Sequence, residues 1–563
     1  MLIILVLKKV ALISIILIIF PYSFPLEDSN DYTPHPPIFI NGNDDFTWEN
    51  GVVSGNGTKG NPYIIEGWEI NASGVYYGIF IWNTDAYFII RNCYIHDSKI
   101  GAVIFINVSN AVLQGIITKR NVNGIEIGFC KNICIEECYT ENMFLQCKNA
   151  RVMKCFCDEI IVYSSTNYSI ERCKIKNSFV IRDSSNGKVS DNSVENKGFI
   201  IRGYRYEHFM HFMSNNTVQG KPIVYCMGKE NFTIEGNESQ IFLMNCRNVE
   251  IKNKNFSNLS VGIEIAYSKN ISISNCNFCN CGKFETFGSI FLINSSSISI
   301  SNSSFEKCDY SISIFATHNF LIKNCSFAKF ETGLLAKSSK KGIILNCIFH
   351  DGEIGIEIYS CTNIKIRYCS MYNNGFVGVM VITTIGLLIS KCNIYNNGYG
   401  DGGGIVIGQS LAEIHFNNIF NNAYYGLYTE YSIVNAIYNY WGSFLGPSRN
   451  RVLHMRGDII YGFMAITLTF PWKFLPFSPI NQKIIYTTFQ NNIGPGVGGR
   501  LTAYAEEIPP SFLGQGRKSQ GESPDGWSRN DTAQGEDDSL RMTLPWDLVK
   551  RPPPWSKSKY RGR

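Results

Sequence analysis

The chain has 563 residues, a formal net charge of +5 and only 17% charged residues. So small a net charge gives no electrostatic case for nucleic-acid binding, and no basic stripe lies within the repeats. Plentiful Ile, Asn, Ser, Phe and Tyr suit many short strands and turns and argue against a fold of amphipathic helices.

The N-terminus has the pattern of an export signal. The Lys8-Lys9 pair is followed by an apolar run over residues 10–20, which ends at Pro21. A short apolar run after positive charge is typical of a signal peptide, and it is too short alone to cross a bilayer of roughly 30 Å. Residues 1–7 are also apolar and no small-residue cleavage site follows, so an uncleaved membrane anchor stays open. We therefore expect a secreted or cell-surface protein.

Residues that resemble a cap precede the repeats. They include Ser54-Gly-Asn-Gly-Thr58 and Asn61-Pro-Tyr-Ile-Ile-Glu66. A solenoid needs such an end because its first coil would otherwise expose core side chains and strand edges.

A short segment then recurs along most of the chain. Its form is Ile-x-x-Cys or Ile-x-x-Asn, and 22 residues is the commonest spacing between copies. A near-constant spacing with occasional insertions indicates one coil of a solenoid per repeat. The cysteines of this column are Cys93, Cys138, Cys155, Cys173, Cys276, Cys325, Cys347, Cys369 and Cys392. Asn192, Asn216, Asn237, Ser303 and Asn417 fill the same column, and Gly115 and Lys254 are its poorest members.

A second signature, Gly-Ile-x-Ile, begins many repeats, at Gly78, Gly124, Gly262, Gly355 and Gly404. The alternation predicts a short strand with two inward side chains, and the glycine is expected to permit the backbone of the turn. Strands this short are stable only when stacked on the coil below. The sequence therefore predicts an all-β fold, a right-handed parallel β-helix of roughly 16 coils.

The cysteines of the repeat column need no chemistry to explain them. An inward residue at a bend can hydrogen-bond the turn backbone, and its copies stack at about 4.8 Å. Cysteine can replace asparagine there because it is small and tolerates burial. We predict that these nine thiols are a structural ladder, buried and free.

Composition divides the rest of the chain. After Pro479 cysteine is absent and no strand or helix period remains, which predicts a disordered, low-complexity tail. The predicted segments are a signal peptide or anchor (1–24), a linker (25–37), the N-terminal cap (38–74), the repeats and terminal coil (75–480), and the tail (481–563).

The cap, the Gly-Ile-x-Ile coils and the terminal Asn439-Tyr-Trp-Gly442 with Gly446-Pro447 resemble a known group. It comprises the parallel β-helix repeat proteins of microbial surfaces, which include a NosD-like periplasmic copper-binding family and carbohydrate-binding and sugar-hydrolase members. The resemblance covers residues 38–480. It implies the fold but not one activity, because this fold serves lyases, hydrolases, adhesins and assembly factors.

Candidate catalytic acids are scattered. Glu126, Glu264 and Glu357 take the outward place of Gly-Ile-Glu-Ile in coils far apart, where we expect them to be solvated. His96-Asp97 and His350-Asp351 recur in equivalent turns that are also far apart, and Asp44-Asp45 and Asp401 lie near opposite ends. A hydrolase or lyase needs converging carboxylates, for proton transfer or for calcium. We therefore expect no catalytic residues.

One segment has residues that suit copper. His208, Met210, His211 and Met213 lie within six residues, and imidazole and thioether are ligands of copper(I). In a strand, His208 and Met210 would face one side and the other two the opposite side, so one ion could not bind all four. We expect no cofactor; copper or calcium is the alternative.

Two further patterns leave alternatives open. Cys130, Cys134 and Cys138 lie four apart, and three more cysteines fall within residues 276–281, which allows scattered disulfides in an exported protein. Asn-x-Ser/Thr occurs 14 times, as at Asn71, and marks candidate glycosylation sites, although Asn and Ser are also turn residues.

The expected function is a non-catalytic surface or secreted protein that binds polysaccharide or envelope components. Exposed tyrosine and asparagine are a reasonable sugar-binding surface. The alternatives are a carbohydrate-active enzyme, either lyase or glycoside hydrolase, and a copper-delivery factor.

Overall fold

The computed structural model describes residues 32–399, 402–448 and 457–477, and over these it is a β-solenoid of about 17 turns. The parallel β-helix prediction is confirmed. The only helical segment among the described residues is a single 3-10 turn, η1 (Tyr206–Phe209). None of the described residues forms a helix long and apolar enough to span a bilayer. The predicted signal segment and tail lie outside the described residues.

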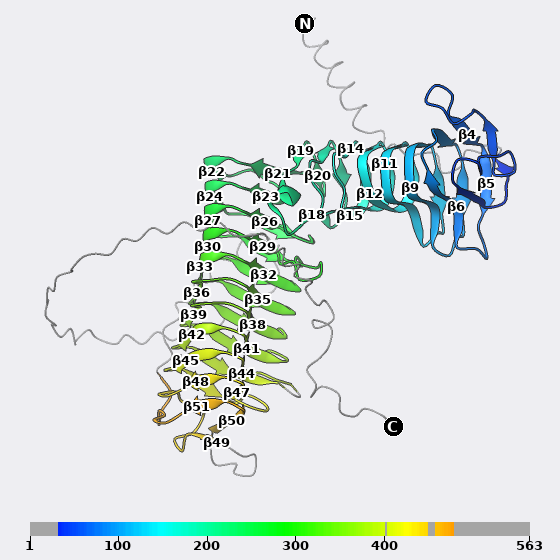
Figure 1. Cartoon of the computed structure of the whole chain (residues 1–563). Helices are drawn as coiled ribbons and strands as arrows, with labels where there is room; N and C mark the ends of the chain where they lie inside the picture. The colour runs from blue at the N-terminus through cyan, green and yellow to red at the C-terminus, as the bar shows by residue number, and fades with distance from the viewer. Residues whose placement is uncertain (1–31, 400–401, 449–456, 478–563) are drawn as a thin grey trace, which may run out of the picture. The chain divides into compact units, whose positions relative to one another are not determined.

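Each coil contributes strands to three parallel sheets, which we number 1 to 3 in the order that the chain visits them. The repeats form two stacks, residues 32–218 and 221–477 (Figure 1). In the first stack, sheet 1 consists of β2 (Ile38–Asn41), β6 (Tyr77–Thr84), β9 (Gly101–Gln114), β11 (Asn123–Glu136), β12 (Tyr139–Met153), β13 (Phe156–Tyr163), β15 (Lys174–Arg182) and β18 (Gly198–Arg202).

Several of these strands continue into the neighbouring sheets. Sheet 2 adds β4 (Tyr63–Glu66), β7 (Phe88–Arg91), β14 (Ser169–Glu171), β16 (Lys188–Ser190) and β19 (Phe212–Ser214), with β3 (Val52–Ser54) antiparallel to β4. Sheet 3 adds β1 (Thr33–Pro34), β5 (Trp68–Asn71), β8 (Tyr94–His96), β10 (Ile117–Lys119), β17 (Ser193–Val194) and β20 (Thr217–Val218).

The second stack is more regular. Its sheet 1 consists of β21 (Lys221–Met227), β23 (Gln240–Met244), β26 (Ile263–Ala266), β29 (Ile290–Ile293), β32 (Tyr310–Phe315), β35 (Thr332–Lys337), β38 (Ile354–Tyr359), β41 (Val377–Ile382), β44 (Gly403–Gly408), β47 (Leu427–Glu430) and β50 (Gly457–Phe463), with β49 (Pro447–Ser448) beside β50.

Sheets 2 and 3 of this stack follow the same order. Sheet 2 consists of β22 (Glu230–Ile234), β24 (Arg247–Lys252), β27 (Lys269–Ser274), β30 (Ser296–Ser301), β33 (His318–Lys323), β36 (Ile343–Leu345), β39 (Lys365–Arg367), β42 (Ile385–Ser390), β45 (Leu411–His415), β48 (Ile433–Asn435) and β51 (Ile466–Leu468). Sheet 3 consists of β25 (Asn255–Ser257), β28 (Asn277–Cys279), β31 (Ser304–Glu306), β34 (Ser326–Ala328), β37 (Ile348–His350), β40 (Ser370–Tyr372), β43 (Asn393–Tyr395) and β46 (Asn418–Phe420).

The break between the stacks was not predicted from the repeats. After β20 the chain reverses through Gln219 and Gly220, which both have positive φ, and β21 pairs antiparallel with β20. Two consecutive left-handed residues form a tight hairpin turn, so the next strand starts a new stack instead of continuing the old one.

The interior is filled by side chains stacked in register. Phe256, Phe278, Phe305, Phe327 and Phe349 form one such ladder, with neighbouring ring centroids 4.3–4.9 Å apart. This spacing matches the distance between hydrogen-bonded strands, because each coil repeats the residue below it.

The glycines of the Gly-Ile-x-Ile signature have a different role from the predicted one. Gly355 does not have a positive φ; a Cβ atom there would lie 2.5 Å from the carbonyl oxygen of Gly378. Gly404 would meet Gly426 in the same way, at 2.6 Å. The glycines are therefore needed for close contact between stacked backbones, not for the turn.

Candidate functional site

A groove with a volume of about 530 Å³ lies on the outer face of sheet 1 of the first stack. It crosses five successive strands, β9, β11, β12, β13 and β15. Its lining includes the side chains of Ile106, Glu126, Phe129, Phe144, Tyr163 and Arg182.

Strand alternation explains why these side chains face outward. In Gly-Ile-x-Ile the two Ile residues point into the core, so the residue between them points to solvent. The strand register aligns Ile104, Glu126, Phe144 and Ile161 in one outward row. An outward row that is mostly apolar is unusual on a soluble surface and marks a candidate binding site.

Aromatic rings are accessible in this groove. Phe129 is 73% exposed and Tyr163 is 43% exposed, while Phe144 is half-buried between them in the register. Phe129 has a positive φ of 54°, which turns its side chain out of the regular strand pattern. Exposed rings with polar neighbours can contact the apolar face of a ligand and hydrogen-bond its edge.

Charged groups lie at two places in the groove. The carboxylate of Glu126 accepts a hydrogen bond from Asn123 Nδ2 at 2.7 Å. The guanidinium of Arg182 lies 5.6 Å from the centroid of the Tyr163 ring, and its Nε is 3.7 Å from the Asp183 carboxylate. That Nε is buried and makes no hydrogen bond to any described residue. The groove therefore offers both an acceptor and an incompletely used donor.

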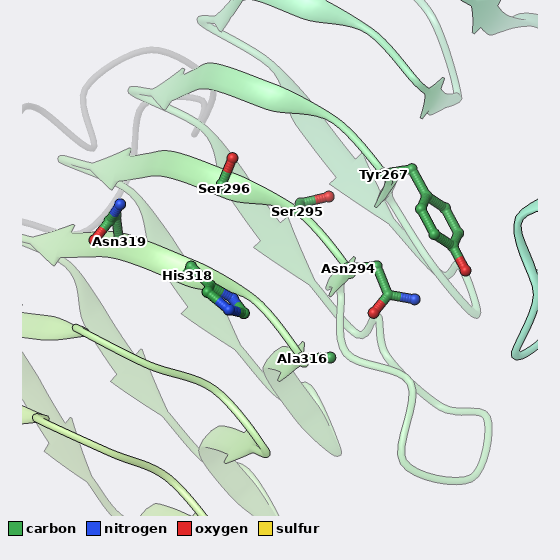
Figure 2. Close-up of a pocket in the computed structure, with 7 residues that line it drawn as sticks. All are labelled: Tyr267, Asn294, Ser295, Ser296, Ala316, His318 and Asn319. Atoms are coloured by element: carbon green, nitrogen blue, oxygen red, sulfur yellow. The ribbon is translucent and has the colours of Figure 1, made fainter. Parts of the chain in front are cut away.

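A second, shallow pocket of about 640 Å³ lies on the turns between sheets 1 and 2 of the second stack (Figure 2). It is lined by one ring, Tyr267, and by amide, hydroxyl and imidazole groups that include Asn294 and His318. Tyr267 Oη donates to the backbone carbonyl of Tyr204 at 3.4 Å, and its ring is 5.1 Å from that of Tyr206. This ring therefore helps to hold the two stacks together and offers little free surface.

Carboxylates also gather on sheet 1 of the second stack. The strand register aligns Tyr310 with Thr332 and then Ile354, which places the residues just before them, Asp309, Glu331 and Glu353, in successive coils. This corrects the sequence-based expectation that no coil neighbourhood concentrates acidic groups. The repeat spacing of 22 residues between these three acids could have revealed them.

Glu357 lies next to this row and is held by hydroxyl groups. Tyr359 Oη donates to its carboxylate at 2.7 Å and Thr332 Oγ1 at 3.4 Å. Burial raises the pKa of Glu357, and the neighbouring Glu331 raises it further. Burial, together with the charge of Asp309, also raises the pKa of Glu331. Two carboxyls with raised pKa values beside tyrosines have the composition of a general acid–base site.

The three glutamates of the Gly-Ile-Glu-Ile motif have different environments. Glu126 lines the groove and Glu357 joins the acidic row, but Glu264 is fully buried, which contradicts its predicted solvation. Its carboxylate accepts a hydrogen bond from the backbone N–H of Ile201 at 3.2 Å, across the junction between the stacks. The sequence could not show this because the residues that cover Glu264 belong to another coil.

The histidine–aspartate pairs are equivalent, as predicted. His96 Nδ1 lies 2.6 Å from the Asp97 carboxylate, and His350 Nδ1 lies 2.8 Å from that of Asp351. They remain in separate stacks. Asp401 lies outside the described residues.

The candidate copper ligands are mostly engaged with protein groups. His208 is in η1 rather than in a strand, and its Nδ1 is 3.4 Å from Asp183. The buried His211 contacts Tyr168 Oη through Nδ1 and the carbonyl of His208 through Nε2. Met210 and Met213 pack against the core. Burial lowers the pKa of His211 to about 4.

The structure buries all nine cysteines of the repeat column, and all 19 cysteines are free thiols. The N–H of Cys347 approaches Cys369 Sγ at 3.5 Å, one coil further on. The strand register corrects one member of the column: Arg91 aligns with Gln114, so Ile116, not Gly115, lies level with Cys93. Gly115 instead occupies the left-handed turn position of Asn92.

Two other ladders were missed. One is formed by Ser, Thr and Cys at the bend between sheets 1 and 2, where the N–H of Thr317 donates to Ser339 Oγ at 3.1 Å. The other runs through Asn374, Asn397 and Asn422 and ends at Asp458. Their 22–26-residue spacing was the available signal.

Comparison with known proteins supports the fold. A family model described as a right-handed β-helix region matches residues 77–238 and 288–439, more than half of the chain. The chain belongs to this right-handed β-helix family. No curated protein matches it.

Solved structures with a similar fold include three surface or polysaccharide-related proteins. The periplasmic alginate epimerase AlgG is 8% identical with a TM-score of 0.26, over 72% of this chain and 85% of that one. The A-module of the Azotobacter vinelandii mannuronan C-5 epimerase AlgE6 is 12% identical with a TM-score of 0.20, over 70% and 91%. PfbA, a surface adhesin of Streptococcus pneumoniae, is 13% identical with a TM-score of 0.30, over 61% and 84%. At these values the likeness concerns the fold alone.

Proposed function

We propose that this chain is an exported or cell-surface protein that binds polysaccharide in the groove of the first stack. The observation that carries the proposal is the groove itself, in which Phe129, Phe144 and Tyr163 share one surface with Glu126 and Arg182. Sugar rings have apolar faces and hydroxyl edges, so aromatic rings beside hydrogen-bonding groups complement them. Export is supported by the basic and apolar pattern of residues 1–24.

The geometry suits an extended ligand. The groove crosses five coils, and successive strands are about 4.8 Å apart, which gives it a length of roughly 20 Å along the stack. A preformed surface on rigid strands needs little ordering on binding, so contacts with several sugar units can add to the affinity.

Binding can be tested by electrophoresis through gels that contain alginate, polygalacturonate, xylan or mixed-linkage β-glucan. We expect at least one polymer to retard the protein, and the double change Phe144→Ala with Tyr163→Ala to weaken retardation at least tenfold, because a ring contact is worth about 1 kcal/mol or more.

A matched control is Tyr395→Ala. Tyr395 is also a half-buried aromatic residue, but both faces of its ring stack on neighbours, Tyr372 at 5.1 Å and Phe420 at 5.0 Å. It should retain binding. Equal retardation of the groove variant and the wild type would contradict the proposal.

The acidic row of the second stack supports a second candidate function, a carbohydrate-active enzyme. Its observation is the raised pKa of Glu357 beside Tyr359 and Glu331. If this site is catalytic, the wild type should release reducing ends or unsaturated products from one of these polymers. Glu357→Gln should then abolish turnover without loss of binding in the groove. A wild type that releases neither product would leave the binding function alone.

A further inference from the structure

The outer face of sheet 1 in the first stack is open at one end and covered at the other. In the outward row, Phe80 and Ile104 align with the residues of the groove, and Ile161 is followed by Val180 and Ile200. Phe80 and Ile161 are partly exposed, whereas Val180 is 3% exposed and Ile200 is fully buried. Something therefore covers this face beyond Ile161.

The cover is a loop of the second stack. The spacing between Cys276 and Ser303 is 27 residues instead of 22, and residues 283–288 form the loop that this insertion allows. We call residues 283–288 the clasp. Phe287 of the clasp packs in one apolar cluster with Val180 and Ile200.

The clasp is fixed at both of its sides. Glu285 forms an ion pair with Arg202, whose guanidinium lies 5.4 Å from the centroid of the Phe287 ring. On the other side, Ser313 Oγ donates to the carbonyl of Thr286 at 2.7 Å. These contacts hold the clasp against the face, so it is an end wall and not a loose loop.

The groove ends at this wall. Ile161 lines the groove and also packs against the cluster that contains Phe287. Arg182, which follows it, aligns in register with Arg202, which is paired with the clasp. The buried Nε of Arg182 has no hydrogen-bond acceptor among the described residues. The closed end therefore presents a hydrogen-bond donor to whatever reaches it.

We propose that the groove binds the end of a sugar chain and not an internal stretch, with the terminal unit against the clasp and Arg182. The inference rests on the proposed polysaccharide-binding function. A chain that lies along the strand stack can leave the groove past Phe80 but not past Val180. A terminal unit has hydroxyl groups that no glycosidic bond occupies, and the free donor of Arg182 suits them.

Chain-end binding predicts a dependence on polymer length. Alginate, polygalacturonate, xylan and mixed-linkage β-glucan would each be used intact and after hydrolysis to short oligomers, as competitors in affinity electrophoresis. At equal mass, hydrolysis multiplies the number of ends. We expect competition by the retarding polymer to increase in proportion to the number of ends, so that tenfold shorter chains compete about tenfold better.

Two variants locate the effect. Arg182→Gln should weaken competition by short oligomers about tenfold, as expected for loss of one hydrogen bond from a charged donor. Lys269→Gln, a change of an exposed cation in the second stack, should have no effect. Deletion of residues 283–287 restores the 22-residue spacing and should make competition depend on mass alone; the wild-type length series decides the question even if that deletion variant does not fold.

The outcomes separate the two proposals. Retardation by none of the polymers overturns polysaccharide binding and chain-end binding together. Retardation with competition that depends on mass and not on the number of ends leaves the groove as a sugar site but overturns chain-end binding. Competition that depends on ends but is unchanged by Arg182→Gln also overturns the assignment of the terminal unit to Arg182.

Discussion

At the scale of single residues, the coil spacing sets what each position tolerates. Gly355 lies where a Cβ atom would be 2.5 Å from the Gly378 carbonyl oxygen, and both groups belong to backbone that cannot move independently. We expect Gly355→Ala to lower the free energy of unfolding by about 1–3 kcal/mol, the usual cost of overpacking. Urea denaturation measures this.

Gly60 provides the comparison, because a Cβ atom there would have no neighbour within 4 Å. Gly60→Ala should change the free energy of unfolding by less than about 1 kcal/mol. Equal losses for the two variants would show that helical coil spacing is not what selects glycine at position 355.

Asp458 is a second residue whose effect can be measured. It ends the asparagine ladder and accepts hydrogen bonds from the N–H and Nδ2 of Asn422 at 3.1 and 2.7 Å. Burial raises its pKa from 3.8 to about 6. A raised carboxyl pKa stabilises the fold below pH 3.8, and this contribution is lost as the pH rises through 6.

Asp458→Asn should therefore remove part of the loss of stability between pH 4 and pH 7. The difference is at most about 3 kcal/mol and is smaller if solvent screens the charge. Asparagine keeps the acceptor oxygen and continues the ladder of Asn374, Asn397 and Asn422. Thermal unfolding of both proteins at pH 4.5 and pH 7.5 tests this; a wild type and variant with the same pH dependence would contradict it.

At the scale of strands and coils, the repeat spacing and alternation were sufficient to predict stacked strands, their inward residues and the column of Cys and Asn. The one-residue error at Gly115 arose because a long turn was read as an interrupted column; only the register of β7 with β9 identifies Ile116. The Asn and Ser/Thr ladders were readable from the same spacing but are less conspicuous, since these residues are also common in turns.

Part of the candidate site was also predictable at this scale. The outward place of Glu126 follows from alternation, and the acidic row follows from the 22-residue spacing of Asp309, Glu331 and Glu353. The groove does not, because its aromatic side chains come from five strands of unequal length and from the left-handed turn residue Phe129.

At the scale of the whole molecule, contacts between the stacks determine which surfaces are available. Pairing of β20 with β21 ends one stack and begins another, and residues of one then bury those of the other, as with Glu264 and Ile200. Burial raises the pKa of Glu264, so its contribution to stability decreases as the pH rises. No local pattern predicts such contacts, because they join residues separated by many repeats.

The central claim is that the groove over β9, β11, β12, β13 and β15 is the ligand site. Hydrogen–deuterium exchange with and without the retarding oligosaccharide tests it most directly, because protection maps onto peptides. We predict slower exchange in peptides that cover residues 126–129, 144–146 and 161–163, with little change over residues 331–359. Protection confined to residues 331–359, or absent from the groove peptides when the ligand is bound, would contradict the account.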